Sequence, residues 1–471
     1  MYDASGKDKR NPFDSDLGRV VFSSGLRRMH DKTQVFPLTS GDFVHTRLTH
    51  SIEVMNVAVS IVMNLCRHQN FKSYFGDTVD PLIIEQQICA IVRAAAIMHD
   101  VGNPPFGHFG EAAIQKFFTS SEGNAYLRSL TDEQMFYDFT QFDGNAQGFR
   151  IMTKLQYLGD LEGLNLTFAT LAAYTKYPNY GSKVKGDYIG RKKHGVMFSE
   201  KEVFDRMVEA CSLRRPDGRV MRHPLAFVVE AADSICYNCM DMEDGMAMGW
   251  FDLDQAISFI EEQVGKRLAK CNSQAYSEHC VEKGRFSLYK LLGIEESKMR
   301  DHTPRKQIVD FRVMLMQYFV NLATKNFLSH LEEIAAGDYG YELIEDDNYG
   351  VAQAVSKLCY SKMFTRKEIR ESELTGEAII TGLLRVVLNH LFSTDPEYRK
   401  RMTTVISETR LGLIVHEASY AQGQKYDPKE SLVDYDVINL PPYYRLKLAL
   451  DWITGMTDKY AMEMYRTLTG R

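Results

Sequence analysis

The chain has 471 residues, of which 44% are hydrophobic and 25% are charged, as in an ordinary globular protein that can bury a sizeable core. Its 56 basic and 62 acidic residues give a formal net charge of −6, which argues against a uniformly basic nucleic-acid-binding surface. A basic pocket for an anionic substrate remains compatible with this balance.

We expect neither an export signal nor a membrane span. The segment MYDASGKDKRNPFDSD lacks the apolar core of a secretory signal, and the best apolar candidate, Ile88–Met98, is interrupted by Arg93. Eight cysteines are too sparse for a disulfide scaffold, and we interpret the one close pair, Cys236 and Cys239, as helix-packing residues. We therefore expect a soluble, cytoplasmic protein.

Apolar residues recur at helical spacing along most of the chain. The pattern predicts helices at Ser51–Arg67, Leu82–Met98, His108–Phe118, Glu200–Ser212, Pro224–Asp241, Leu253–Cys271, Arg305–Ala336, Glu373–Phe392, Pro428–Val437 and Tyr443–Leu468. No series of alternating short segments indicates strands, and the glycine-rich, charged stretches Tyr180–Lys193 and Gly337–Gly350 are predicted loops. The sequence predicts an all-α fold with little or no strand, in one large domain over residues 1–471.

Four separated residues could together hold a metal ion. His99 and Asp100 end an apolar helix, where such a pair taken alone is more often structural. His50 precedes another apolar helix, and Asp233 lies inside an apolar helical segment, where a carboxylate is costly unless it is paired or bound to metal. This mixed nitrogen and oxygen set suits Mn²⁺, Mg²⁺, Co²⁺, Fe or Zn²⁺ with water in the open positions. The alternative interpretations are that His50 is only a histidine at a helix start and that Asp233 is an acid in a buried ion pair.

The order of these residues resembles that of HD-domain metal-dependent phosphohydrolases, and longer blocks are similar to bacterial deoxyguanosinetriphosphate triphosphohydrolases (dGTPases). The blocks run in order from Leu26 nearly to the C-terminus: LRRMHDKTQVFPL, HTRLTHS, HDVGNPPFGHFGEAAI, FDGNAQGFRI, TLAAYTKYP, AADSICYNCMDMEDG, ESELTG and WITGMTDKYA. The resemblance implies an HD core at about 44–245 and a C-terminal helical subregion at about 250–471 that contributes to the nucleotide pocket. It also implies hydrolysis of dGTP at the α-phosphorus, which yields deoxyguanosine and inorganic triphosphate.

The resemblance also assigns roles to individual residues. The four-residue set would hold the divalent metal, with Mn²⁺ or Mg²⁺ expected first, and His108 with Glu111 would form the catalytic pair. His108 would act as general acid to the 5′-oxygen or would activate the nucleophile, while Glu111 orients it. The alternative is a capping pair at a helix N-terminus. The implied substrate contacts are Gln34, Arg47, Asn145, Lys176, Tyr177, Lys193, Tyr237, Phe364 and Glu373.

The phosphate contacts have a charge rationale. A triphosphate carries about four negative charges, so several cations must converge on it. Arg47 is three residues before His50, and Lys176 lies in a block that matches the family. Lys193 is a weaker match, since Lys192 beside it could serve instead. The family usually has Glu where this chain has Asp143, a departure that should not affect the chemistry.

The nucleoside contacts have a shape and hydrogen-bonding rationale. The ring of Tyr237, beside the sugar, would exclude a 2′-hydroxyl, and Gln34 would bond the 3′-hydroxyl. Glu373 would accept hydrogen bonds from guanine N1 and N2 while Phe364 stacks on the base, and adenine would leave this acceptor unmatched. The alternative interpretations are that Tyr237 is a core tyrosine, that Gln34 is a surface glutamine and that Glu373 is an exposed acid on a helix.

Three other functions remain as alternatives: a broad dNTP triphosphohydrolase, an HD phosphodiesterase with another nucleotide substrate, and a nucleotide- or DNA-binding regulator with little turnover. The regulator predicts loss of a metal ligand or of the catalytic pair, yet all six residues are present. The resemblance further implies a homohexamer that associates with single-stranded DNA, to which the basic pairs Arg27-Arg28 and Arg214-Arg215 could contribute. No membrane partner is expected.

Overall fold

Helices dominate the chain. The computed structural model describes residues 11–34, 45–75, 80–156, 159–181, 188–271, 281–282, 285–429 and 431–470. The strands among these residues are β1 (Val281–Glu282) and β2 (Arg285–Phe286), which pair in antiparallel fashion. The prediction of an all-α fold with little strand is confirmed.

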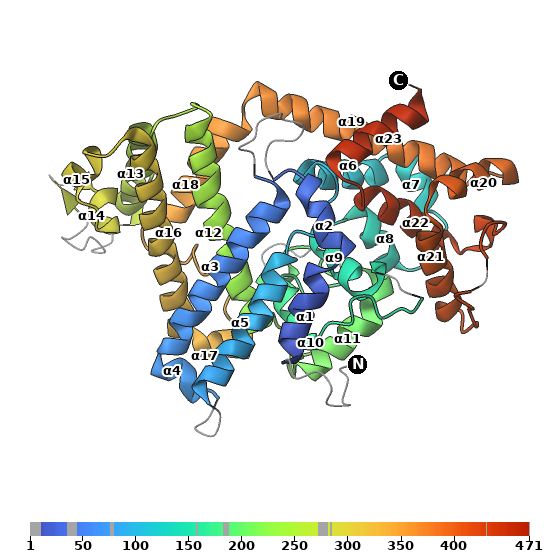
Figure 1. Ribbon diagram of the computed structural model, residues 1–471, viewed down its shortest axis with the longest axis horizontal. Helices are drawn as coiled ribbons and strands as arrows, with labels where there is room; N and C mark the ends of the chain where they lie inside the picture. Colours follow the sequence, from blue (N-terminus) through green and yellow to red (C-terminus); the bar gives the residue numbers. More distant parts are fainter. Residues whose placement is uncertain are drawn as a thin grey trace. The chain divides into compact units, whose positions relative to one another are not determined.

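The chain divides into two compact units. The first unit comprises Met1–Ser51, Ile97–Ala226 and Ser372–Arg471, and the second comprises Ile52–Ala96 and Phe227–Glu371. The borders fall inside long helices that Figure 1 labels: α3 (Arg47–Arg67), α5 (Pro81–Ile97), α12 (Pro224–Ala247) and α19 (Lys367–Leu391).

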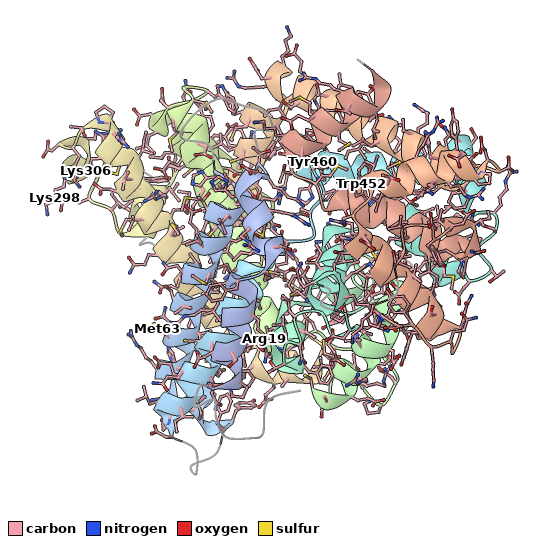
Figure 2. The ribbon with its side chains drawn as sticks, turned by 45° about the vertical axis from the view of Figure 1, so that its right-hand side comes forward. Arg19, Met63, Lys298, Lys306, Trp452 and Tyr460 are labelled. Carbon is pink, nitrogen blue, oxygen red and sulfur yellow. The ribbon has the colours of Figure 1, made fainter. Side chains whose placement is uncertain are left out.

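The first unit has a core built from α6 to α9 and the C-terminal helices. Besides parts of the long helices it contains α1 (Pro12–Val21), α2 (Ser24–Arg28), η1 (Met29–Asp31), α6 (Gly107–Thr119), α7 (Ser121–Leu127), α8 (Glu133–Thr140), α9 (Gly144–Arg150), η2 (Ile151–Leu155), α10 (Phe168–Tyr174), η3 (Ile189–Arg191), η4 (Phe198–Glu200), α11 (Lys201–Ala210), α20 (Pro396–Val405), α21 (Glu408–Ala421), η7 (Val437–Asn439), α22 (Pro442–Thr454) and α23 (Asp458–Thr469). Phe118, Leu384 and Leu446 are fully buried in this core. Trp452 on α22 and Tyr460 on α23 are labelled in Figure 2.

A buried ionic cluster ties α9 to the C-terminal part of the first unit. Arg150 is fully buried, and its guanidinium lies 2.6 Å from a carboxylate oxygen of Glu200 and 2.7 Å from oxygens of Glu417 and Asp451. Burial alone would lower the pKa of Arg150, but the charges of these acids raise it. Because each carboxylate is also buried, removing the arginine would leave unpaired charge in the core.

The second unit is a smaller helical assembly. It contains α4 (Gln69–Ser73), α13 (Leu253–Cys271), α14 (Leu288–Leu292), α15 (Glu296–Arg300), α16 (Pro304–Ser329), α17 (Leu331–Ala336), α18 (Val351–Cys359), the π-helical turn η6 (Tyr360–Phe364) and the short β1–β2 pair. Helix α13 packs against α18. Lys298 of α15 and Lys306 of α16, labelled in Figure 2, are exposed.

Most of the predicted helices are confirmed, although their ends shift. The helix predicted at Arg305–Ala336 divides into α16 and α17 at His330, whose backbone angles (φ −114°, ψ 23°) are not helical. The helix predicted at Tyr443–Leu468 divides after Gly455, and Thr457 caps the new helix by accepting a hydrogen bond from the Tyr460 N–H. Cys236 and Cys239 are fully buried on α12, as the packing interpretation predicts.

The prediction of a helix at Pro428–Val437 is wrong. The described residues of this segment are irregular up to the 3₁₀ turn η7. Two of its acidic side chains bond to other groups instead: Asp434 pairs with Lys400 at 2.9 Å, and Asp436 pairs with Arg399. Asp436 also accepts a hydrogen bond from the Ile438 N–H at 3.0 Å, which starts η7.

One described helix, α3, is long and apolar enough to cross a membrane by length and composition alone. Within the relevant window 44% of its residues are buried, and the core helix of a globular protein passes the same test. This is weak evidence for a membrane span.

Candidate metal centre and catalytic pair

Three of the predicted metal ligands come together in the first unit. His50 lies in the first turn of α3, and His99 and Asp100 lie in the turn that follows α5. One potential ligand atom from each residue lies within 4.8 Å of the others. The two imidazole rings meet edge to face with their centres 5.3 Å apart. Neutral imidazole nitrogens and a carboxylate at this spacing fit a divalent cation.

Neighbouring side chains orient Asp100. Arg47, which is 2% exposed, donates from Nη1 to Asp100 Oδ2. Asn103 donates from Nδ2 to Asp100 Oδ1 at 2.6 Å. The turn that presents these groups is closed by a hydrogen bond from the Asn103 N–H to the Asp100 carbonyl at 3.2 Å. Such partners fix the direction in which a ligating carboxylate points.

Two glycines permit the close packing around this turn. A Cβ on Gly102 would overlap the backbone of Gly144 and Gly148, so α9 lies directly against the turn. Gly107 starts α6 at a φ of +56°, a left-handed conformation that favours glycine, and a Cβ there would overlap the Arg47 guanidinium. Arg47 therefore contacts both Asp100 and the beginning of α6.

His108 and Glu111 form a hydrogen-bonded pair on the first turns of α6. His108 Nδ1 lies 2.9 Å from Glu111 Oε2, and the other carboxylate oxygen accepts the Gly144 N–H at 2.6 Å. The hydrogen bond and charge of Glu111 raise the pKa of His108. Burial alone would raise the pKa of Glu111, but His108, Lys193 and the Gly144 N–H lower it to about 2. The His108 side chain is 76% exposed and that of Glu111 is 9% exposed, so the carboxylate holds an imidazole that faces solvent.

Lys193 and Asn145 share one anchor, Asp143. Lys193 Nζ lies 3.2 Å from Asp143 Oδ2, and Asn145 donates from its backbone N and its Nδ2 to Asp143 Oδ1 at 2.9 and 2.7 Å. Although burial lowers it, the charges of Asp143 and Glu111 raise the pKa of Lys193, which keeps the ammonium charged. The Asp at position 143 therefore positions both predicted phosphate contacts.

Tyr177 lies among cations. Lys176 Nζ is 5.7 Å and Lys193 Nζ is 5.9 Å from the centre of its ring, and Arg222 Cζ is 5.8 Å from it. Arg222 also donates from Nε to the Lys176 carbonyl at 2.8 Å. The predicted contacts Lys176, Tyr177 and Lys193 thus form one basic cluster around an aromatic ring.

Two predicted nucleoside contacts also belong to the first unit. Gln34 has a buried Oε1 atom without a hydrogen-bond partner among the described residues, which suits a contact to a hydroxyl group. Glu373 is half-buried on α19, one turn before Gly376. A Cβ on Gly376 would lie 2.9 Å from the Cβ of Phe106, so this part of α19 packs on the turn that leads to His108.

The remaining predicted site residues lie in the second unit. Asp233 and Tyr237 are half-buried on α12, and Asp233 adds to burial in raising the pKa of the Tyr237 hydroxyl. The Tyr237 hydroxyl lies 3.5 Å from Ser356 Oγ. Phe364 ends η6 and is half-buried. Their participation in one site with the residues of the first unit remains a prediction.

Sequence reasoning missed several residues that support this site. Asn103 bonds to Asp100, Arg222 stands beside Tyr177, and Tyr174 donates from its hydroxyl to the Asn145 carbonyl at 3.0 Å. Asn103 could have been found, because it lies in the block HDVGNPPFGHFGEAAI. The contacts of Arg222 and Tyr174 join residues far apart in the chain, and no local pattern marks them.

Comparison with known proteins adds to this geometry. The HD domain family model matches residues 47–136, a range that contains His50, His99, Asp100, His108 and Glu111. The chain is 34% identical to a deoxyguanosinetriphosphate triphosphohydrolase-like protein of Listeria monocytogenes, over 98% of this chain and 95% of that protein. It is 31% identical to a like-named protein of Pseudomonas aeruginosa, over 98% and 94% of the two chains. It is also 30% identical to a deoxyguanosinetriphosphate triphosphohydrolase of an Enterobacter species, over 97% and 93%.

Proposed function

The chain belongs to the dGTPase family of HD-domain phosphohydrolases, and on this premise we propose that it hydrolyses dGTP to deoxyguanosine and inorganic triphosphate. The observation that carries the proposal is the metal-competent group of His50, His99 and Asp100, joined through Arg47 to the helix that bears His108 and Glu111. A metal-binding group beside a histidine–carboxylate pair suits the hydrolysis of a phosphate ester.

We propose that His50, His99 and Asp100 would hold the metal, with Asp233 as the fourth ligand. When bound, a divalent metal supplies a Lewis acid that polarises the α-phosphate and holds water. Mn²⁺ or Mg²⁺ is the proposed ion, and the mixed ligand set also accommodates Co²⁺, Fe and Zn²⁺. Arg47 and Asn103 keep Asp100 turned toward the two imidazoles.

His108 acts as the general acid. Glu111 holds Nδ1, which leaves Nε2 to carry the transferable proton, and the raised pKa of His108 favours the protonated form. Water attacks the α-phosphorus and releases one proton to the solvent, the bond from this phosphorus to the 5′-oxygen breaks, and the bonding electrons pass to that oxygen. His108 delivers its proton to the same oxygen, so deoxyguanosine leaves and triphosphate remains.

We propose that cations from separate elements bind the triphosphate. Arg47, Lys176 and Lys193 supply positive charge, and Tyr177 and Asn145 supply polar contacts. Asp143 fixes the Lys193 ammonium.

We propose that Glu373 and Phe364 read the guanine base, while Tyr237 and Gln34 read the sugar. A carboxylate accepts from both guanine N1–H and N2–H, whereas adenine leaves it without these donors. The half-buried position of Glu373 supports this role, because an unmatched acceptor costs more when it is shielded from water.

Steady-state rates with dGTP, dATP, dCTP, dTTP and GTP, in Mn²⁺ or Mg²⁺, test the substrate. We expect dGTP to be hydrolysed fastest, and the Glu373→Gln variant to lose most of the preference over dATP. Glu371→Gln, an exposed acid on the same helix, is the matched control and should keep the preference. Equal rates on dATP and dGTP in the unmodified protein would contradict the guanine assignment and favour a broad dNTP triphosphohydrolase.

The family premise also supports a homohexamer, a cytoplasmic location and association with single-stranded DNA. The basic pairs proposed for DNA differ in their surroundings: Arg27 and Arg28 end α2, whereas Arg214 pairs with Asp205 at 3.1 Å and Arg215 lies 3.6 Å from Asp217. Mass measurement in solution tests the hexamer, and a stable monomer would contradict it. DNA binding that weakens with salt and in an Arg27→Glu variant supports the effector role, and salt-independent binding counts against it.

A further inference from the structure

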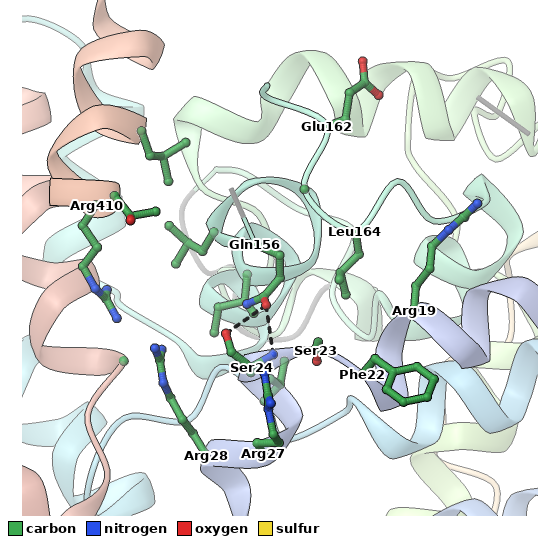
Figure 3. Close-up of a pocket in the computed structure, with 18 of the residues that line it drawn as sticks. Arg19, Phe22, Ser23, Ser24, Arg27, Arg28, Gln156, Glu162, Leu164 and Arg410 are labelled. Atoms are coloured by element: carbon green, nitrogen blue, oxygen red, sulfur yellow. Dashed lines mark hydrogen bonds between the residues drawn. The ribbon is translucent and has the colours of Figure 1, made fainter. Parts of the chain in front are cut away.

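A cavity of about 810 Å³ opens beside α2 in the first unit, and none of the candidate metal or catalytic residues lines it. Figure 3 shows its walls, which come from the end of α1 and from α2, from the segment after η2, and from the start of α21. A smaller hollow of about 450 Å³ shares Arg28, Ser407, Arg410 and Gly455 with it. The volume of the larger cavity is in the range of about 300–1,000 Å³ that small-molecule sites occupy.

Cations gather at one end of this cavity. Arg28 ends α2 and Arg410 lies in the first turn of α21, and their guanidinium groups point toward one another in Figure 3. Arg27 and Lys32 line the same cavity. Lys32 is 3% exposed and donates from Nζ to the carbonyls of Asn103 and Thr454 at 2.5 and 3.0 Å, so its ammonium is held in place.

These positive charges repel one another. Within the described part of the chain, no carboxylate forms an ion pair with Arg28 or Arg410, and Arg410 donates to the backbone carbonyl of Asp451. Burial and then Arg28 lower the pKa of Arg410 to about 10. Burial lowers the pKa of Lys32 to about 7 against the opposing effect of Asp458. A bound anion would relieve this repulsion.

The rest of the cavity is lined by neutral polar groups, an apolar wall and two acids, Asp160 and Glu162. Ser24 donates from its backbone N and its Oγ to Gln156 Oε1 at 3.2 and 3.0 Å. These two hydrogen bonds do not use the Nε2 donor of Gln156. Phe22 is 83% exposed at the rim, and Leu164 lines the wall. The acid Glu162 lies on the wall away from Arg28 and Arg410 in Figure 3.

We propose that this cavity binds an oligophosphate, either free or as the diphosphate group of a small organic ester, with Arg28, Arg410 and Lys32 as its cationic contacts. Several converging cations match a multiply charged oxyanion better than a single carboxylate, and guanidinium groups match phosphate oxygens in geometry. The proposal does not rest on the proposed dGTP hydrolysis, since none of the candidate metal or catalytic residues lines the cavity.

Isothermal titration calorimetry in metal-free buffer tests the site, with inorganic pyrophosphate as one probe and isopentenyl diphosphate as the other. Arg28→Gln removes one cation from an exposed position, and Arg27→Gln is a second variant in the same cavity. Arg214→Gln is the matched control, because it loses the same charge outside the cavity. Lys176→Gln reports binding at the proposed catalytic site. Circular dichroism verifies that each variant is folded.

We expect saturable binding that Arg28→Gln weakens by about tenfold or more, and that Arg214→Gln and Lys176→Gln leave unchanged. This pattern with pyrophosphate identifies a free oligophosphate as sufficient, and the same pattern with isopentenyl diphosphate alone identifies an organic ester. Absence of saturable binding for both probes would overturn the proposal. Binding that is lost in Lys176→Gln but kept in Arg28→Gln and Arg27→Gln would overturn it as well.

Discussion

Replacing Glu111 by glutamine removes the charge that holds His108 while keeping the size of the side chain. Unit charges about 4 Å apart interact by about 1 kcal/mol in water and about 4 kcal/mol near a protein surface. The His108 side chain is 76% exposed, so we place the interaction near the lower limit, at about 1–2 kcal/mol. If this energy stabilises the imidazolium that donates the proton, kcat/KM should fall by about 5- to 30-fold at neutral pH.

The pH profile provides the sharper readout. A general acid is active when protonated, so the rate should fall as pH rises through the pKa of His108. Because Glu111 raises that pKa, Glu111→Gln should start the fall at lower pH. Rates on dGTP from pH 5 to 9 measure this, and Glu122→Gln is the control, since Glu122 pairs instead with Arg385 on the surface. A Glu111→Gln profile that matches the unmodified protein in height and position would refute the reasoning.

Four further outcomes follow from the geometry. His108→Ala should lower kcat by about 10²- to 10⁴-fold, and full turnover would undo its assignment. His99→Ala should abolish calorimetric binding of Mn²⁺, and the unmodified protein treated with chelator should regain activity when Mn²⁺ is restored. Gly102→Ala should destabilise the fold by about 1–3 kcal/mol in urea titration, since its Cβ would overlap the Gly144 carbonyl; an unchanged midpoint would contradict this packing. Arg150→Met should cost about 3–5 kcal/mol in the same assay, because it removes the cation that Glu200, Glu417 and Asp451 share and leaves Glu417 with Lys154 alone.

Helical periodicity was a sufficient guide where one face of a segment is apolar and no polar side chain competes for the backbone. The predicted Leu253–Cys271 coincides with α13 residue for residue. The pattern failed at Pro428–Val437, because distant Arg399 and Lys400 bind its acids and Asp436 starts a 3₁₀ turn instead. Long-range ion pairs of this kind have no signature in a local window.

The candidate site was predictable as a set of residues but not as a network. His50, His99 and Asp100 are brought together as expected, and His108 bonds to Glu111 one turn away. The supporting contacts could not be read from spacing, since they depend on how separate helices pack.

Hydrolysis of dGTP in ¹⁸O-labelled water, followed by mass spectrometry of the products, tests the central claim most directly. Attack of water on the α-phosphorus predicts intact triphosphate that carries one ¹⁸O atom, together with unlabelled deoxyguanosine. Release of pyrophosphate or single phosphate would contradict the proposed reaction, and ¹⁸O in deoxyguanosine would contradict attack at phosphorus.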